Sequence, residues 1–301
     1  MYTRVLLRSF VYALPASILL LSSCGNNGSK EKVESEVETT KVDSNRATLF
    51  QVGDELFSIP SPIQTAKLIK ESGANYNSEI LNPANKANSY STKVQKSLNL
   101  GVYGADLGYV TMYDQTQDAI SFLNASKKIA DDLGVTSAFS PSLIKRFEAN
   151  LGNKDSLLFL VSDAYRASDA YLKNNERDDV GSLILAGGWI ESLYFATTVA
   201  KTAKSEEINR RIGEQKNTLE NLIKLLERYN NNEEFADLVN QLIDLYYLFD
   251  EIYVSYEYVK PTTNEKTKTT TINSTSSVDF TEEQLTAIIE KIESIRQFIV
   301  G

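Results

Sequence analysis

The chain has 301 residues, of which 42% are hydrophobic and 10% aromatic, enough to bury the core of one large domain or two smaller ones. Its formal charge of −9 opposes binding to nucleic acid, which normally needs clustered lysines and arginines. The absence of histidine removes Ser-His-Asp triads, Cys-His pairs and the usual zinc sites. We therefore expect no nucleic-acid partner, no metal and no cofactor. A non-enzymatic role is favoured, although an enzyme built on carboxylates, Lys, Ser or Tyr stays open.

The first 24 residues have the layout of an export signal. Arg4 and Arg8 give a positively charged start, and an apolar run over residues 10–21 follows. This run is shorter than the ~20 residues that a membrane span needs. It ends in Leu21-Ser22-Ser23-Cys24, which resembles the lipidation signal of bacterial lipoproteins. The resemblance implies removal of residues 1–23 and attachment of lipid to Cys24, so that the lipid is the contact with the membrane.

After this signal the chain is predicted to divide into a tether and a helical domain. Residues 24–48 are short polar alternations with few large apolar groups, which predicts a flexible tether. The helical domain is predicted over 49–301. It opens with a short extended arm or loop over 49–60, and then a helix that starts at Ser61 with a capping box and ends at Gly73.

Apolar residues at helical spacing predict most of the remaining elements. A loop is expected over 74–88, followed by helices over 89–112 (one helix or a kinked pair), 114–133, 141–151, 155–174, 178–204, 205–229, 233–254 and 281–298. The short connections favour antiparallel packing of sequential helices. The predicted fold class is all-α, an antiparallel bundle of about eight helices. Near 253–272 the strand-like alternation and the threonine-rich run leave two alternatives open, a small β-hairpin or a disordered loop.

Two of the predicted helices carry glycines on one face. Gly101, Gly104 and Gly108 lie in the first segment, and Gly187 and Gly188 in the second. Each interior glycine costs about 1 kcal/mol relative to alanine, so a group of them needs a reason. Two reasons stay open: a close crossing of two helices, or room for a ligand.

Polar and aromatic residues in the same segments are candidates for a binding site. Asp106 and Glu191 are carboxylates beside these glycine faces, where burial is costly unless they are paired. The aromatic candidates are Tyr109, Tyr113, Trp189 and Tyr194, which suit contacts with a sugar or another small polar molecule. The competing interpretation is a structural network with Arg166, Arg210 or Arg211. No catalytic residue is assigned, and the paired acids at helix ends are explained by capping.

The segments Leu100–Leu107 and Gly187–Tyr194 resemble an uncharacterised group of helical lipoproteins from Gram-negative bacteria. This resemblance implies export and a helical fold but no activity. The first functional hypothesis is an interaction or scaffold module of the cell envelope, held at the outer membrane by its lipid, with an envelope protein as partner. The alternative is a small-molecule or glycan binder that uses Asp106 and Glu191.

Overall fold

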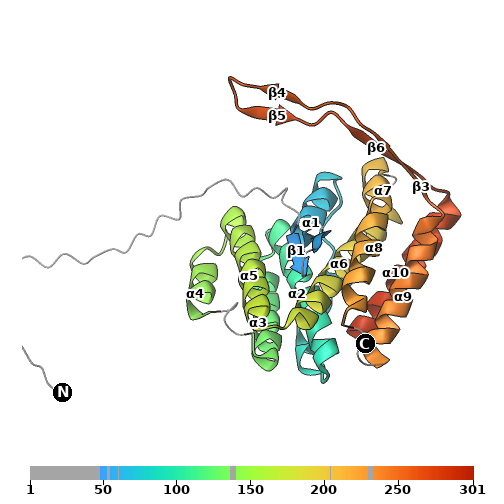
Figure 1. The fold of residues 1–301 in the computed structure, drawn as a ribbon. Helices are drawn as coiled ribbons and strands as arrows, with labels where there is room; N and C mark the ends of the chain where they lie inside the picture. The colour runs from blue at the N-terminus through green and yellow to red at the C-terminus, as the bar shows by residue number, and fades with distance from the viewer. Residues whose placement is uncertain (1–47, 53–54, 60, 136–139, 204, 230–232) are drawn as a thin grey trace, which may run out of the picture. The chain divides into compact units, whose positions relative to one another are not determined.

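The computed structural model describes residues 48–52, 55–59, 61–135, 140–203, 205–229 and 233–301 (Figure 1). The predicted signal peptide, Cys24 and residues 24–47 of the predicted tether lie outside the described residues. The described part has an all-α fold with small antiparallel strand pairs, so the predicted fold class is confirmed.

Ten α-helices lie in the described residues: α1 (Pro62–Glu71), α2 (Lys93–Met112), α3 (Thr116–Leu133), α4 (Pro141–Ala149), α5 (Lys154–Asn174), α6 (Asp178–Ala200), α7 (Glu206–Gly213), α8 (Gln215–Glu227), α9 (Glu233–Asp250) and α10 (Glu282–Val300). The segment predicted as one helix over 205–229 is two helices. Gly213, a weak helix former, ends the first of them, and a side chain at this position would overlap Val278.

Local signals set several helix ends. Ser61 and Gln64 form the predicted capping box of α1, and Thr281 and Gln284 form that of α10. After α3, Gly134 adopts the left-handed conformation with a φ of 70°, which ends the helix as predicted. Because each of these signals acts within four residues, the sequence alone was enough to place them.

The segment between α1 and α2 is more ordered than the predicted loop. It holds two 3-10 helices, η1 (Ser78–Ile80) and η2 (Ala84–Asn88). A third capping box, in which the backbone N–H of Gln95 donates to Thr92 Oγ1 at 3.0 Å, starts α2 at Lys93 and not near residue 89. Upstream, β1 (Thr48–Val52) pairs antiparallel with β2 (Glu55–Ile59), so the described part of the predicted arm is a pair of strands.

The central pair of helices is α2 and α6, which lie side by side (Figure 1). They run in the same direction, because Lys93 pairs with Asp179 at their first turns, Gly101 meets Gly188 midway, and the ring of Tyr109 meets that of Phe195 further along, at 4.9 Å. Some sequential helices pack antiparallel as predicted. Lys96 near the start of α2 contacts Asp132 near the end of α3, and Lys216 at the start of α8 contacts Asp250 at the end of α9.

Two hydrophobic cores flank this central pair, and both α2 and α6 contribute side chains to each. The first core lies among α1, α3, α4 and α5, and the second among α7, α8, α9 and α10. Within the described residues, α6 alone is long and apolar enough to cross a membrane, with a mean hydropathy of 1.3. Most of it is buried inside the protein, and contact with two cores explains why it is apolar nearly all round.

A β-ribbon interrupts the helices between α9 and α10 and extends away from them (Figure 1). β3 (Tyr253–Glu257) pairs antiparallel with β6 (Thr275–Asp279), and at the tip β4 (Thr262–Asn264) pairs with β5 (Thr269–Thr271). The hairpin alternative is therefore confirmed over the disordered loop. Its extent differs, because the threonine-rich run pairs at the tip and the partner of β3 lies beyond residue 272.

Candidate functional site

Asp106 of α2 and Glu191 of α6 come together in the interior, where both side chains are fully buried. Arg296 of α10 donates from Nε to Glu191 Oε2 at 2.8 Å and from Nη2 to Glu191 Oε1 at 2.9 Å. The same Nη2 also donates to the backbone oxygen of Ile80 at 2.9 Å. The ring of Tyr194 lies under the guanidinium, 4.3 Å from it. Glu191 is thus held by a bidentate ion pair with Arg296, whose guanidinium also contacts Ile80 and Tyr194.

The buried carboxyl of Asp106 is the unusual member of this group. Neither of its oxygens accepts a complete hydrogen bond from the described residues, although the backbone of Asn82 and the carboxyl of Glu191 lie near it. Burial raises the pKa of Asp106 well above its ordinary value, and the charge of Glu191 raises it further, against the opposing effect of Arg296. We infer that Asp106 is protonated at neutral pH.

The negative charge of the acid pair is then carried by Glu191. Burial raises the pKa of Glu191 as well, but the hydrogen bonds from Arg296 act in the other direction. Burial alone would lower the pKa of Arg296, but the hydrogen bonds to Glu191 and the nearby negative charge together raise it. With Asp106 neutral, the three side chains have no net charge, which is the condition for burying them together.

The arginine of this cluster is not one of those considered from the sequence. Arg166 pairs with Asp163 at 3.3 Å, and both Arg210 and Arg211 bond to Glu214. Arg296 lies 105 residues after Glu191 in the chain, and no local pattern links the two. The structural-network interpretation holds in kind, but with a different partner.

A second set of buried polar groups lies on the same side of α2. Asn82 Nδ2 donates to Tyr90 Oη at 2.9 Å and to Asn99 Oδ1 at 3.2 Å. Asn99 Nδ2 in turn donates to the backbone oxygen of Ile299, at 2.8 Å. Asn82 and Asn99 are fully buried. Together with Arg296, these bonds join the 78–90 segment, α2 and the end of α10, a connection that the sequence did not reveal.

The other aromatic candidates do not surround the acid pair. Tyr109 stacks on Tyr76, and Tyr113 packs against Tyr76 at a tilt. Their hydroxyls bond to the chain itself: Tyr109 Oη accepts from the backbone N–H of Asn77 at 3.1 Å, and Tyr113 Oη donates to the backbone oxygen of Ala74 at 2.7 Å. Burial raises the pKa of Tyr113 to about 12. These rings fasten the segment after α1 to α2.

Trp189 lies apart from the acid pair, in the second core. Its Nε1 donates to Gln215 Oε1 at 3.0 Å, and its side chain is buried. Of the six candidate residues, the structure therefore brings together Asp106, Glu191 and Tyr194. The remaining three belong to packing contacts elsewhere in the fold.

The glycines serve the crossing of α2 and α6. A Cβ on Gly101 would overlap the backbone oxygen of Ile184, and one on Gly187 would overlap that of Leu98. Gly104 has a different reason, since a side chain there would overlap the hydroxyl of Tyr165. Close backbone approach, the first of the two explanations, accounts for Gly101 and Gly187.

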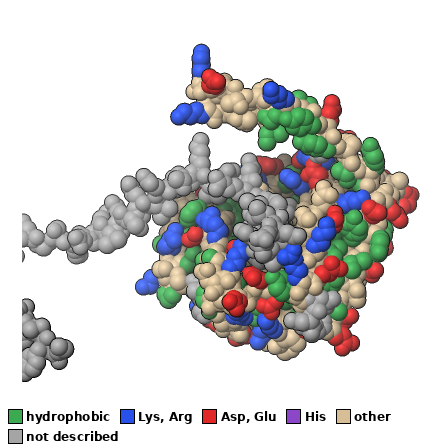
Figure 2. Space-filling model, in the orientation of Figure 1, with side chains coloured by type: hydrophobic (Ala, Val, Ile, Leu, Met, Phe, Trp, Pro, Cys, Tyr) green, Lys and Arg blue, Asp and Glu red, His purple; other side chains and the backbone are tan. Residues whose placement is uncertain are grey.

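Exposed apolar side chains gather on the β-ribbon. The exposed fractions of these residues are 67% for Tyr253, 66% for Tyr256, 69% for Tyr258 and 73% for Ile272. Figure 2 shows hydrophobic side chains on the part of the ribbon nearer the helices, and basic and acidic side chains at its outer end. In the described part of the chain, no group of three or more Asp, Glu or Cys residues is placed to hold a metal ion.

Comparison with known proteins returned nothing: no protein-family model, no curated protein and no solved structure matches the chain.

Proposed function

We propose that this chain is a lipid-anchored interaction module of the bacterial cell envelope, and that its β-ribbon binds an extended segment of another envelope protein. The observation that supports the proposal is the ribbon itself, which carries large apolar side chains outside both cores. Exposed apolar surface of this kind marks sites of protein interaction. An isolated two-stranded ribbon is also only marginally stable in water, so a partner would add to its stability.

The inner end of the ribbon is fixed to the helices, and the outer part is free. Val278 packs against Gly213 of α7, and its cross-strand neighbour is Val254. Alternation along β3 places Tyr256 on the same face as Val254 but beyond this contact. The ribbon is therefore fixed to the helices at its inner end, and its apolar side chains further out, such as Tyr256, are exposed.

An extended polypeptide fits the ribbon better than a globular surface would. In the described part of the chain, β3 and β6 pair only with each other, which leaves one edge of each strand for a further strand. Partner segments that add to such an edge gain affinity from backbone hydrogen bonds and specificity from alternate side chains. The tyrosines supply the side-chain contacts.

Photocrosslinking in the native bacterium tests the partner. A photoreactive phenylalanine at Tyr256 or Tyr258 is expected to give an adduct of defined mass with an envelope protein. The matched control is Tyr247 on α9, which is 64% exposed but not on the ribbon, and it should give none. Adduct formation at Tyr247 with equal yield, or no adduct at either ribbon position, would contradict the proposal.

The anchor is tested separately by metabolic labelling with a clickable fatty acid. The full chain is expected to take up the label and to be recovered with the outer membrane, and Cys24→Ser is expected to lose both. Label on the Cys24→Ser variant would mean that lipid is attached elsewhere.

The alternative role as a glycan or small-molecule binder at Asp106 and Glu191 gains no support from the geometry. Both side chains are fully buried, and both carboxylate oxygens of Glu191 already accept hydrogen bonds from Arg296.

A further inference from the structure

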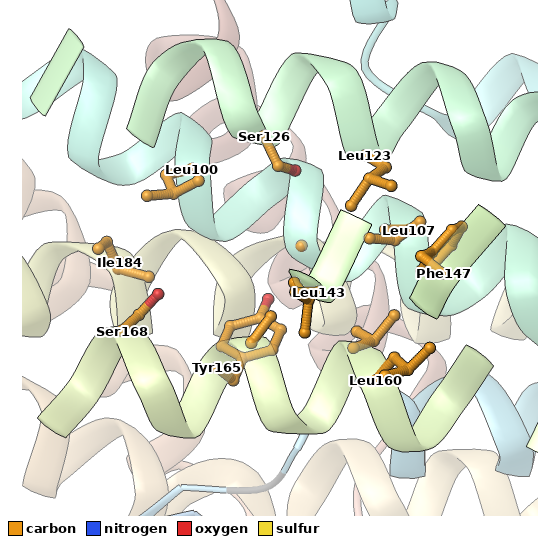
Figure 3. Close-up of a pocket in the computed structure, with 13 residues that line it drawn as sticks. Leu100, Leu107, Leu123, Ser126, Leu143, Phe147, Leu160, Tyr165, Ser168 and Ile184 are labelled. Atoms are coloured by element: carbon orange, nitrogen blue, oxygen red, sulfur yellow. The ribbon is translucent and has the colours of Figure 1, made fainter. Parts of the chain in front are cut away.

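A cavity of about 30 Å³ lies in the first core, between α2, α3, α4, α5 and α6 (Figure 3). This is more than the about 10–15 Å³ that one water molecule needs. Apart from Ser126, Tyr165 and Ser168, its lining is apolar. It does not involve the acid pair or the β-ribbon.

The hydroxyl of Ser126 is buried at this cavity and has no hydrogen-bond partner in the described residues. Serines inside helices commonly donate to the carbonyl four residues earlier. Ser121 on the same helix does so, to Gln117, and Ser162 on α5 does so, to Leu158. Ser126 differs from them, and Figure 3 shows its oxygen on the side of α3 that faces the cavity. A buried hydroxyl without a partner destabilises the fold, and a ligand that forms a hydrogen bond with it would remove that penalty.

The cover of the cavity is α4, a helix of nine residues. Its buried side chains are Leu143 and Phe147, and both line the cavity. Its ion pair with α5, Arg146 to Asp163 at 3.6 Å, is largely exposed and contributes little. Outward movement of α4 would therefore cost mainly the core contacts of Leu143 and Phe147, and a ligand beneath the helix would replace those contacts.

We propose that this cavity binds a small, mainly apolar molecule with a single hydroxyl group. The hydroxyl pairs with Ser126, the apolar part lies against Leu123, Leu160 and the two α4 side chains, and α4 moves outward to make room. Tyr165 and Ser168 lie on the other side of the cavity from Leu160 and Phe147 (Figure 3). A ligand with a second polar group at the end beside Leu160 and Phe147 would bury that group among apolar side chains. The site is thus selective for molecules with one polar end.

Titration of the full chain with 1-hexanol, followed by the methyl NMR signals of Leu143 and Leu160, tests the site. We expect saturable shifts at both residues, and at least tenfold weaker binding of 1,6-hexanediol. Ser126→Ala should weaken hexanol binding about two- to tenfold, the effect of losing one hydrogen bond. Ser121→Ala, which removes a hydroxyl from the same helix outside the cavity, should leave it unchanged.

A filled cavity is the second arm of the test. Ala164→Leu places a larger side chain in the lining and should abolish the saturable shifts. If that variant does not fold, the comparison of the two alcohols on the unaltered chain still decides. Shifts that rise linearly without saturation, equal binding of the diol, or equal affinity in Ser126→Ala would each overturn the proposal.

Discussion

Two carboxylates in one buried cluster have opposite electrostatic situations. Glu191 has a bidentate partner in Arg296, whereas Asp106 has no complete hydrogen bond, and burial favours its neutral form. The same substitution, acid to amide, should therefore have opposite effects at the two positions.

Asp106→Asn is expected to stabilise the protein by about 1–3 kcal/mol at pH 8, because the amide resembles the protonated acid at every pH. The folded-state pKa of Asp106 is raised, so its contribution is complete below the pKa of the unfolded chain and is lost as pH rises through the folded value. The free energy of unfolding, measured with denaturant at pH 4.5 and pH 8, should fall less steeply with pH in the variant. An equal or steeper fall in the variant would show that the pKa of Asp106 is not raised in the folded protein.

Glu191→Gln is expected to destabilise the protein by about 3–5 kcal/mol, because it leaves the guanidinium of Arg296 mostly buried without its counter-charge. Denaturant unfolding at pH 7 measures the change. Glu293→Gln on α10, which removes an exposed ion pair with Lys201, is the control and should change stability by less than about 1 kcal/mol. An equal loss in both variants would argue against a special role for the buried pair.

The contact of α2 with α6 depends on the absence of side chains at particular positions. Gly101→Ala and Gly187→Ala would each place a methyl group against the backbone of the facing helix, which cannot move away as a side chain can. We expect a loss of about 2–4 kcal/mol from each, measured by denaturant unfolding. Gly108→Ala is the matched control on α2, since a Cβ there meets only Ile63 Cγ1 at 3.4 Å, and its better helix propensity should make it neutral or stabilising.

At the scale of helices and strands, a feature could be predicted where its signal comes from residues close together in the sequence. The capping boxes at Ser61 and Thr281 and the end of α3 at Gly134 involve neighbours in sequence, and the prediction was right at each. The partner of Glu191 and the register of β3 with β6 depend on residues far along the chain, for which periodicity holds no information. The glycine faces did mark the crossing of α2 and α6, but not which of them required it.

Across the whole molecule, the elements that form the cores and the part of the ribbon proposed to bind a partner are separate. The two cores on either side of α2 and α6 bury the apolar side chains of the helices, and the buried polar groups at Asn82, Asn99 and Arg296 join α10 to this assembly. The outer half of the β-ribbon takes part in neither. The exposed apolar side chains of this outer half are explained better by the proposed binding than by folding.

Shortening the ribbon separates the two roles. Replacing residues 259–273 by an Asn-Gly turn would join Tyr258 to Ser274 and preserve the pairing of β3 with β6. Every replaced residue is exposed, so the melting temperature should change by no more than about 2 °C, as followed by circular dichroism. The yield of the photocrosslinked adduct at Tyr256 should fall severalfold, because the partner segment loses its contacts with the outer strands. A fall of more than about 5 °C would instead place the ribbon among the elements that hold the fold together.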